Sequence, residues 1–448
     1  MKNFNEIKKA IVDTAAELGI EKYEIFYQTS SEISTETLKD ELSNFSMGTS
    51  GGICFRCIVN DRMGYASTEL MEIEEMHSLV ARAAANAKFI DSDDASIIFF
   101  GSKEYGSKTS QYSKLPDVSA MKSLALDVQK QNYAQNECVS DGTQSAVIAY
   151  ETETKIINSE GLELSNKASM SAAYSVIVVK KDGEPSQGSE IALLSNNAKV
   201  QNLAESAYKS AISKLGAGEV DTGTYNIVIS GKQMRNILQA FWPVFSAKNV
   251  RLGTSLLANK IGDKVASECV TISDDPFDSA CPIQTTFDAE GVAVYKKNVI
   301  ENGILKTFLY NLSEASRAQV ESTANAYKAG YSDTIGIHPY RFAIEPGKHS
   351  LDDLFDVVGD GLYITETKGL HAGTNSVTGD FSIESAGYVI ENGKQGRPVK
   401  SFTIAGNFYD LLKNISHIGN EMDYGLPSGL FVVASPSILV RNISVAGK

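Results

Sequence analysis

The chain has 448 residues and a formal net charge of −14, from 41 lysines and arginines against 55 aspartates and glutamates. With 42% hydrophobic and 21% charged residues it has the balance of a globular protein, and its length is enough for two or three domains. An acidic surface repels phosphate backbones, and no run of Lys or Arg interrupts it. The composition therefore argues against direct binding to nucleic acid.

The first 18 residues, MKNFNEIKKAIVDTAAEL, have the pattern of an amphipathic helix and lack the apolar core of a signal peptide. No stretch approaches the roughly 18 apolar residues that a membrane span needs. The five cysteines are odd in number and scattered, which is typical of reduced thiols in the cytosol. The sequence predicts a soluble, cytoplasmic protein without a membrane partner.

The N-terminal part, residues 1–218, is predicted to mix helices and antiparallel strands. Apolar residues at three- and four-residue spacing indicate helices over 4–18 and 71–89. Short strands are expected between them, over 23–29, 33–42, 52–59 and 63–67. Residues 1–91 are thus expected to form an α-β-β-β-β-α unit, and the polar, Gly- and Ser-rich segment 92–116 a linker.

Residues 117–218 are expected to hold a helix over 118–133, a series of antiparallel strands and a helix over 197–215. The run GAGEVDTG, which starts at Gly216, is the predicted boundary between the two parts of the chain.

Residues 219–448 are predicted to form a mostly antiparallel β domain. A strand over 225–230 and an amphipathic helix over 232–246 come first, and strands with Gly-containing turns follow. Two of these turns have the sequence Glu-Asn-Gly, which is a strong hairpin signal. The single tryptophan, Trp242, lies in the predicted helix and belongs either to the core or to an interface. The predicted fold class is α+β.

The histidines argue against a metal site built on one helix. Two imidazoles must lie about one turn apart to share a zinc ion, whereas the nearest two histidines are eleven residues apart and none precedes a Glu. Cys54 and Cys57 form a C-x-x-C motif, but residues three apart on a strand point to opposite faces. The sequence therefore predicts no catalytic metal site in this chain. The five histidines are His77, His338, His349, His371 and His417.

Two further segments carry polar groups. GSKEYGSKT (101–109) misses the phosphate-binding loop motif because Ser107 follows the second glycine where Lys is required. The densest polar cluster lies in GLHAGTNSVTGDFSIES (369–385), and it either lines a cleft that binds substrate or satisfies the backbone of a turn. No nucleophile elbow marks a Ser-His-Asp triad there. Its candidate substrate-binding residues are His371, Asn375, Thr378, Asp380 and Ser382.

From this cluster onward, NSVTGDFSIESAGYVIENGKQGRPVKSFTIAGNFYDLLKNISHIGNE (375–421) resembles the C-terminal signature of the TldD/PmbA family, also labelled modulator of DNA gyrase. Segments 251–276 and 285–311 resemble the middle of the family's C-terminal domain, and 41–69 resembles its N-terminal domain. The resemblance covers most of the chain.

The resemblance implies a place in the branch called PmbA or TldE. The TldD branch carries zinc on an HExxxH-type helix together with a cysteine near the C-terminus. Here the corresponding helix reads QMRNILQAFWPVFSAKN (233–249), with Gln, Ala and Val at the positions of ligands and base, and the last cysteine is Cys281. The chain is then expected to lack a cofactor and to assemble with a TldD-like subunit that holds the zinc, or with itself.

The function implied is that of a subunit of a two-component metallopeptidase that takes part in proteolysis and binds peptide without catalysing hydrolysis. An extended peptide is commonly held by addition to a sheet edge. Two alternatives remain open. One is an autonomous hydrolase with an unrecognised site, and the other is a protein-binding modulator of DNA gyrase.

Overall fold

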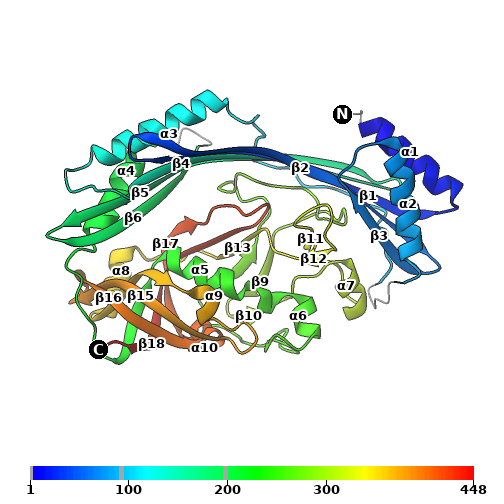
Figure 1. Ribbon diagram of the computed structural model, residues 1–448. Helices are drawn as coiled ribbons and strands as arrows, with labels where there is room; N and C mark the ends of the chain where they lie inside the picture. The colour runs from blue at the N-terminus through cyan, green and yellow to red at the C-terminus, as the bar shows by residue number, and fades with distance from the viewer. Residues whose placement is uncertain (1–3, 90–94, 195–199) are drawn as a thin grey trace.

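The computed structural model describes residues 4–89, 95–194 and 200–448. A long, arched N-terminal sheet lies above a C-terminal domain rich in strands (Figure 1). This arrangement confirms the predicted α+β class. None of the described helices combines the length and the apolar character required to cross a bilayer.

The N-terminal sheet has six antiparallel strands in the order β3-β2-β1-β4-β5-β6. The strands are β1 (Lys22–Leu38), β2 (Glu41–Val59), β3 (Arg62–Thr68), β4 (Gln144–Asn158), β5 (Glu163–Lys181) and β6 (Glu184–Leu193). The expectation of four strands before residue 70 is wrong, because 23–29 and most of 33–42 belong to the single strand β1. The polar residues between them stay in the strand because they pair with β2 on one side and β4 on the other, as Ser30 does with Ser50 and Thr152.

All four helices of this part lie on the upper, convex face of the sheet (Figure 1). They are α1 (Phe4–Glu17), α2 (Ile73–Asn86), α3 (Val118–Tyr133) and α4 (Leu203–Ile212), and a short 3-10 turn, η1 (Val200–Asn202), precedes α4. The Asp117 carboxylate accepts hydrogen bonds from Ser119 and Ala120 at the start of α3, which begins and ends where the sequence predicts. The first three residues of the helix predicted over 197–215 lie outside the described residues.

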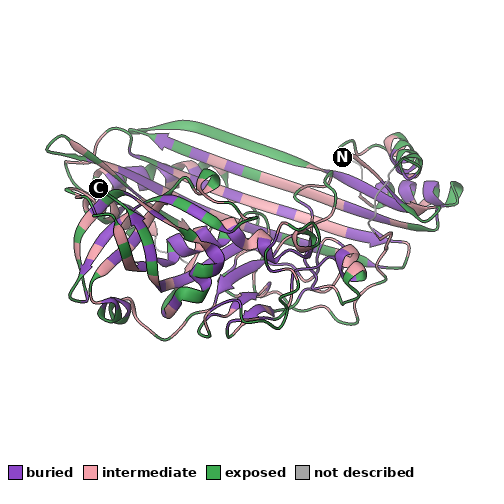
Figure 2. Cartoon of the chain, turned by 90° about the horizontal axis from the view of Figure 1, so that it is seen from below, coloured by how far each residue is buried: buried purple, intermediate pink, exposed green. Residues whose placement is uncertain are grey.

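The lower face of the sheet packs on the C-terminal domain. Cys54 contacts Phe26 and Phe287 on this face, whereas Cys57 lies in the core under α1 and α2. The two thiols therefore lie on opposite faces, as predicted. Seen from below, buried and exposed residues alternate along the strands, except on one edge strand, which is exposed over a long stretch (Figure 2).

Residues 95–117 form neither helix nor strand and run between the two parts of the molecule. The Tyr105 hydroxyl donates to the Gly291 carbonyl at 2.9 Å, and the Lys108 amine donates to the Asn166 side chain at 2.7 Å. Burial lowers the pKa of Lys108. The GSKEYGSKT segment thus makes hydrogen bonds to both the N-terminal sheet and the C-terminal domain. It lies between no strand and helix of the kind that frame a phosphate-binding loop.

The C-terminal domain is built on a ten-stranded sheet in which only the pairs β13–β18 and β14–β7 are parallel among the described strands. Strands β18, β16, β15, β14 and β7 pair in sequence, and β7 pairs back to β18, so that five strands close into a barrel. This strand pairing confirms the prediction that the C-terminal domain is a mostly antiparallel β structure. Its strands are β7 (Gly223–Ile229), β8 (Ile272–Asp274), β9 (Lys297–Glu301), β10 (Ile304–Leu305), β11 (Ala326–Tyr327), β12 (Gly336–Ile337), β13 (Arg341–Ile344), β14 (Gly361–Lys368), β15 (Asp380–Glu391), β16 (Lys394–Asn407), β17 (Ile415–Tyr424) and β18 (Val432–Ala446).

The main helix of this domain, α5 (Gly231–Phe241), packs Met234, Ile237 and Leu238 into the core. The sequence predicts one helix to residue 246, but Pro243 cannot donate a backbone hydrogen bond, and the chain continues as the 3-10 turn η2 (Trp242–Phe245). Trp242 is half-buried against the ring of His338 at 4.4 Å. The remaining helices are α6 (Ala247–Arg251), α7 (Leu312–Ala318), α8 (Leu351–Val358), α9 (Leu370–Gly373) and α10 (Phe408–Asn414).

Candidate functional site

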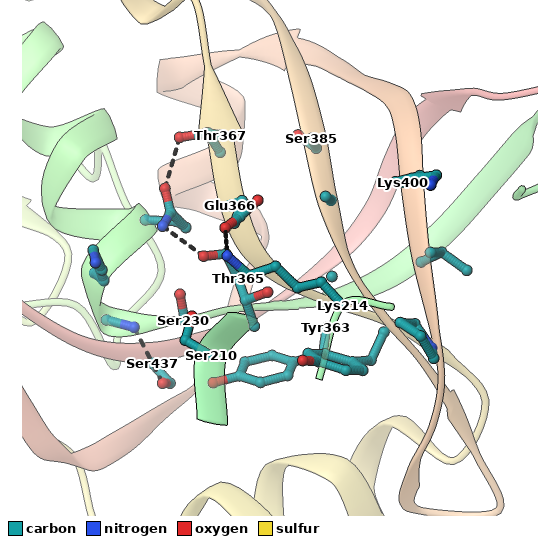
Figure 3. A pocket seen from close by; sticks show the side chains of 18 of the residues that line it. Ser210, Lys214, Ser230, Tyr363, Thr365, Glu366, Thr367, Ser385, Lys400 and Ser437 are labelled. Atoms are coloured by element: carbon teal, nitrogen blue, oxygen red, sulfur yellow. Dashed lines mark hydrogen bonds and ion pairs between the residues drawn. The ribbon is translucent and has the colours of Figure 1, made fainter. Parts of the chain in front are cut away.

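A cavity of about 900 Å³ separates strand β6 and helix α4 from the strands of the C-terminal barrel (Figure 3). We call it the interdomain cleft. Its walls come from β6 on one side and from β14, β15, β16 and β17 on the other, and the first turn of α5 closes one end. Segments far apart in the sequence therefore meet in one hollow of the size that small-molecule and peptide ligands occupy.

The start of α5 brings polar groups to the cleft. Gly231 is required there because a Cβ atom would lie 2.6 Å from the Ser435 carbonyl and 2.9 Å from the side chain of Asp423. The Gly231 amide donates to the Ser437 hydroxyl at 3.2 Å. The hydroxyl of Ser230, the residue before the helix, is buried and has no hydrogen-bond partner among the described residues. This end of the cleft thus has a polar group available to a ligand.

Gln233 attaches α5 to the opposite wall. Its amide nitrogen donates to the Thr365 carbonyl at 2.7 Å, and its oxygen accepts from the Thr367 hydroxyl at 2.7 Å (Figure 3). Only 4% of Gln233 is exposed, so both bonds are protected from water. The side chain is therefore fixed, and it sets the separation between α5 and β14.

Ion pairs join the two walls of the cleft at Lys214–Glu366 and at Lys400–Glu184. Lys214, which follows α4, forms an ion pair with Glu366 of β14 and donates to the Gln187 carbonyl of β6 at 2.7 Å. Lys400 of β16 lies 2.9 Å from Glu184 of β6. Hydrogen bonds from Lys400 and from the Gly216 amide lower the pKa of Glu184. These contacts join the N-terminal part to the barrel along one side of the cleft.

Tyr363 and Tyr388 line the cleft beside these ion pairs. Burial, together with the nearby Tyr388 and Asp423, raises the pKa of Tyr363 to about 12. The Tyr388 hydroxyl donates to the Ser213 hydroxyl at 2.6 Å. At neutral pH the Tyr363 hydroxyl is protonated, so it can donate a hydrogen bond to a ligand but cannot act as a base. The cleft is equipped to hold a polar, extended ligand.

The five candidate residues from the sequence lie elsewhere. His371 is in α9, Asn375 and Thr378 are in the turn after it, and Asp380 and Ser382 begin β15; all five are exposed, and none is among the described residues that line the cleft. The structure brings them together on one surface but not into the cavity.

Most of the hydrogen bonds of this cluster are local. The Asn375 side chain accepts from the backbone amides of Val377 and Thr378 at 3.0 and 3.3 Å. The Asn407 amide donates to Asp380 at 2.9 Å, and this bond, with a second from Thr378, lowers the pKa of Asp380. These contacts stabilise the turn, and substrate binding by the cluster stays a prediction.

The residues that do line the cleft carried little signal in the sequence. Gln233 lies in the helix that corresponds to the family's motif helix, but Lys214, Glu366 and Lys400 are single charges in or next to ordinary helices and strands. Only the pairing of strands that are distant in sequence makes them neighbours.

The described side chains do not gather into a set of metal ligands. No three His, Cys, Asp or Glu residues gather to hold one within 4–89, 95–194 and 200–448. His349 at the cleft and His417 approach each other, with ring centroids 4.9 Å apart, but no third His, Cys, Asp or Glu of the described residues joins them to hold an ion. No chemical step through zinc is therefore derived for this chain.

Comparison with known proteins places this architecture in a family. The sequence profiles described as PmbA/TldA metallopeptidase domain 1, central domain and C-terminal domain match residues 23–87, 113–215 and 222–447. An uncharacterized protein of Methanocaldococcus jannaschii is 30% identical over 94% of this chain and 95% of its own length. A Haemophilus influenzae protein named metalloprotease PmbA homolog is 24% identical over 99% of this chain and 96% of its own length.

Solved structures have the same fold. A candidate modulator of a DNA gyrase from Thermotoga maritima superposes with a TM-score of 0.90 at 27% identity, covering 99% of this chain and all of that one. TldE from Thermococcus kodakarensis gives a TM-score of 0.83 at 23% identity over 98% of this chain and all of that one. The sequence profiles, which extend over most of the chain, and the 30% identical relative show that the chain belongs to the PmbA/TldA metallopeptidase family.

Proposed function

We propose that this chain is the peptide-holding subunit of a two-component, cytoplasmic metallopeptidase, and that a TldD-like partner supplies the zinc. Membership of the metallopeptidase family supports a role in proteolysis. The observation that carries the proposal is the interdomain cleft, whose α5 end presents the Ser230 hydroxyl and whose β14 wall presents the Tyr363 hydroxyl. Such groups bind peptide backbone but cannot activate water as a zinc ion does.

The shape of the cleft favours an extended peptide. Strand β6 lines one wall and, among the described strands, pairs with β5 alone, so its other edge can accept a further strand. Main-chain hydrogen bonds along such an edge do not depend on the side chains of the peptide. The paired charges of Lys214 and Glu366 beyond it offer polar contacts to those side chains.

The purified chain should contain less than about 0.1 zinc per chain and show no chelator-sensitive peptidase activity. The physical reason is that a zinc site needs three or four closely spaced ligands, and α5 bears none of the usual ones. Elemental analysis and a peptidase assay, each on the chain alone and after mixing with a TldD-like subunit encoded in the same genome, check this.

Activity that requires both chains, and that is lost on chelation, supports the proposal. About one zinc per chain in the isolated protein, with hydrolysis that a chelator abolishes, would falsify it in favour of an autonomous hydrolase.

The exposed cluster remains a second, separable candidate for peptide contact. If it binds substrate as predicted from the sequence, replacing Asn375 and Asp380 with alanine should reduce hydrolysis by the reconstituted pair several-fold while circular dichroism stays unchanged. The matched control is Asp410→Ala, a surface carboxylate on α10 that pairs with Lys413. Equal activity in the double variant and the control would assign Asn375 and Asp380 to the turn alone.

A further inference from the structure

Helix α5 begins at the interdomain cleft without the groups that normally occupy a helix N-terminus. Ser230, the residue before the helix, makes no capping hydrogen bond with its side chain, and the first turn holds no acidic residue. A capping oxygen or a carboxylate usually accepts hydrogen bonds from the first amides and offsets the positive end of the helix dipole. The positive end of α5 therefore meets the cleft without a negative partner from its own turn.

Ser230 gives independent evidence that this end of the cleft takes a ligand. Only 8% of the residue is exposed, it lines the cleft, and its hydroxyl has no hydrogen-bond partner among the described residues (Figure 3). A buried polar group without a partner is costly and rare in native structures. The hydroxyl is accounted for if a bound group accepts its hydrogen bond.

Lys232 adds two further donors beside Ser230. Its backbone amide is among the first amides of α5, which have no carbonyl of the same helix to bond. Its side chain is exposed, lines the cleft and makes no ion pair with the part of the chain that the structure describes. A lysine in the first turn does not favour the helix itself, because it adds to the positive end of the dipole. The hydroxyl, the amide and the ammonium group together suit an anion.

Carboxylates on the walls beside α5 have cations of their own. Asp423, whose side chain approaches Gly231, pairs with Arg235. Glu366 of β14 pairs with Lys214. An anion at the start of α5 therefore meets donors that are unpaired and carboxylates that are neutralised or, where they are exposed, screened by water and salt. The exposed carboxylates that line the cleft are Glu190, Glu384 and Glu421.

We propose that the start of α5 binds the C-terminal carboxylate of the peptide in the interdomain cleft. This inference rests on the proposed peptide-holding function and adds to it a preference for one end of the peptide. One carboxylate oxygen accepts from the Ser230 hydroxyl, the other accepts from the Lys232 amide, and the Lys232 ammonium group pairs with the charge. An α-carboxyl group has an ordinary pKa of about 3.5, so it is ionised at neutral pH.

The occupant is a chain end because of the shape of the cleft. The first turn of α5 closes one end of it, so a peptide that runs along β6 has no straight path beyond the helix. Capture of a terminal carboxylate by clustered backbone donors is a known mode of peptide recognition. The site is also held in place, because the Ser230 amide donates to the Ile364 carbonyl of β14 at 3.0 Å. Donors that are fixed before binding lose little freedom when the ligand arrives.

Two forms of one peptide pool test whether the carboxylate is recognised. Random decapeptides made without aspartate or glutamate, and labelled with fluorescein at the N-terminus, are prepared as free acids and as C-terminal amides. Fluorescence anisotropy with the purified chain should give a Kd at least tenfold lower for the acids, because the amides lack the negative charge. Leaving out acidic side chains makes the terminal group the one difference between the two pools.

Substitutions at the start of α5 should remove this preference without removing peptide binding. Ser230→Ala and Lys232→Gln should each weaken binding of the acids at least threefold, and the double variant should bind acids and amides equally. Binding of the amides should change less than twofold throughout. The matched control is Lys248→Gln, which removes an exposed lysine of α6 that does not line the cleft and should keep the full preference. Circular dichroism verifies that each variant folds.

The outcomes separate this inference from the peptide-holding role. Equal affinity of the parent chain for acids and amides would overturn carboxylate recognition and leave peptide holding intact. A preference for the acids that survives in Ser230→Ala/Lys232→Gln would also overturn it, because the carboxylate would then bind elsewhere. If neither pool binds, the peptide-holding role fails and this inference fails with it. A preference that depends on Ser230 and Lys232, and not on Lys248, supports the proposal.

Discussion

Replacing Arg56 with methionine should lower the free energy of unfolding by about 3–5 kcal/mol, as for the removal of one partner from a buried ion pair. Arg56 is 4% exposed and lies on the lower face of the N-terminal sheet. It donates to both oxygens of the buried Glu24, at 2.8 and 3.0 Å, and lies 3.8 Å from Glu290 of the C-terminal domain. Its loss would remove the guanidinium that contacts both Glu24 and Glu290.

The pKa values around Arg56 show how these charges depend on one another. Burial disfavours the charged guanidinium, but Glu24 and Glu290 more than offset it, and the pKa of Arg56 is raised above its usual range. Nearby, burial and then the charge of Glu290 raise the pKa of Asp288 to about 8. Asp288 also accepts three backbone hydrogen bonds, which oppose that rise. The buried Lys328 also interacts with Glu24, but the ion pairs with both Glu24 and Glu290 come from Arg56, and removing Arg56 removes them.

Urea denaturation of the variant measures the loss, and two controls separate charge from volume. The double variant Arg56→Met/Glu24→Leu should recover part of the stability, because it also removes one stranded carboxylate. Arg62→Met, at an exposed position on β3, should change the free energy of unfolding by less than about 0.5 kcal/mol. If Arg56→Met costs no more than Arg62→Met, the cluster does not hold the sheet to the C-terminal domain.

Elements defined by local signals were predicted well from the sequence. Helix α3 begins at Val118 because Asp117 caps it, and both the cap and the apolar spacing are visible in one stretch of chain. The polar middle of strand β1 predicts a break between two strands, which the structure does not have. Those residues are held by neighbours on both sides that come from distant parts of the sequence, Ser50 and Thr152 for Ser30. Pairing of this kind leaves no local trace.

The candidate residues at 369–385 lie outside the cleft for a similar reason. The cluster at 369–385 was conspicuous because its polar residues are close in sequence, and in the structure such residues satisfy their own turn, as Asn375 does. The cleft arises from Lys214, Gln233 and Glu366, which are spread over about 150 residues and meet only when α4, α5 and β14 are assembled. The family was predicted from the resemblance of whole segments, such as 375–421, and not from the spacing of single residues, and the sequence profiles confirm it.

Replacing Ala386 with tryptophan should weaken peptide binding at least about tenfold, which corresponds to about 1.4 kcal/mol. Ala386 is half-buried on β15, lines the interdomain cleft and pairs with Glu366 of β14. Cross-strand partners point to the same face of a sheet, and Glu366 reaches Lys214 across the cleft. An indole at 386 would therefore occupy the space between the barrel and β6, where an extended peptide is proposed to add to the edge.

Fluorescence anisotropy of a pool of fluorescein-labelled random decapeptides, titrated with the chain and its TldD-like partner, measures this loss. Gln395→Trp adds the same ring at an exposed position on β16 that does not line the cleft, and it should leave the affinity unchanged. Ala386→Ser, which keeps the cleft open, should bind within about twofold of the parent. Because the added ring acts by occupying volume, a folded Ala386→Trp variant with unaltered affinity would mean that the peptide lies outside this cleft, and the exposed cluster at 369–385 would become the next site to test.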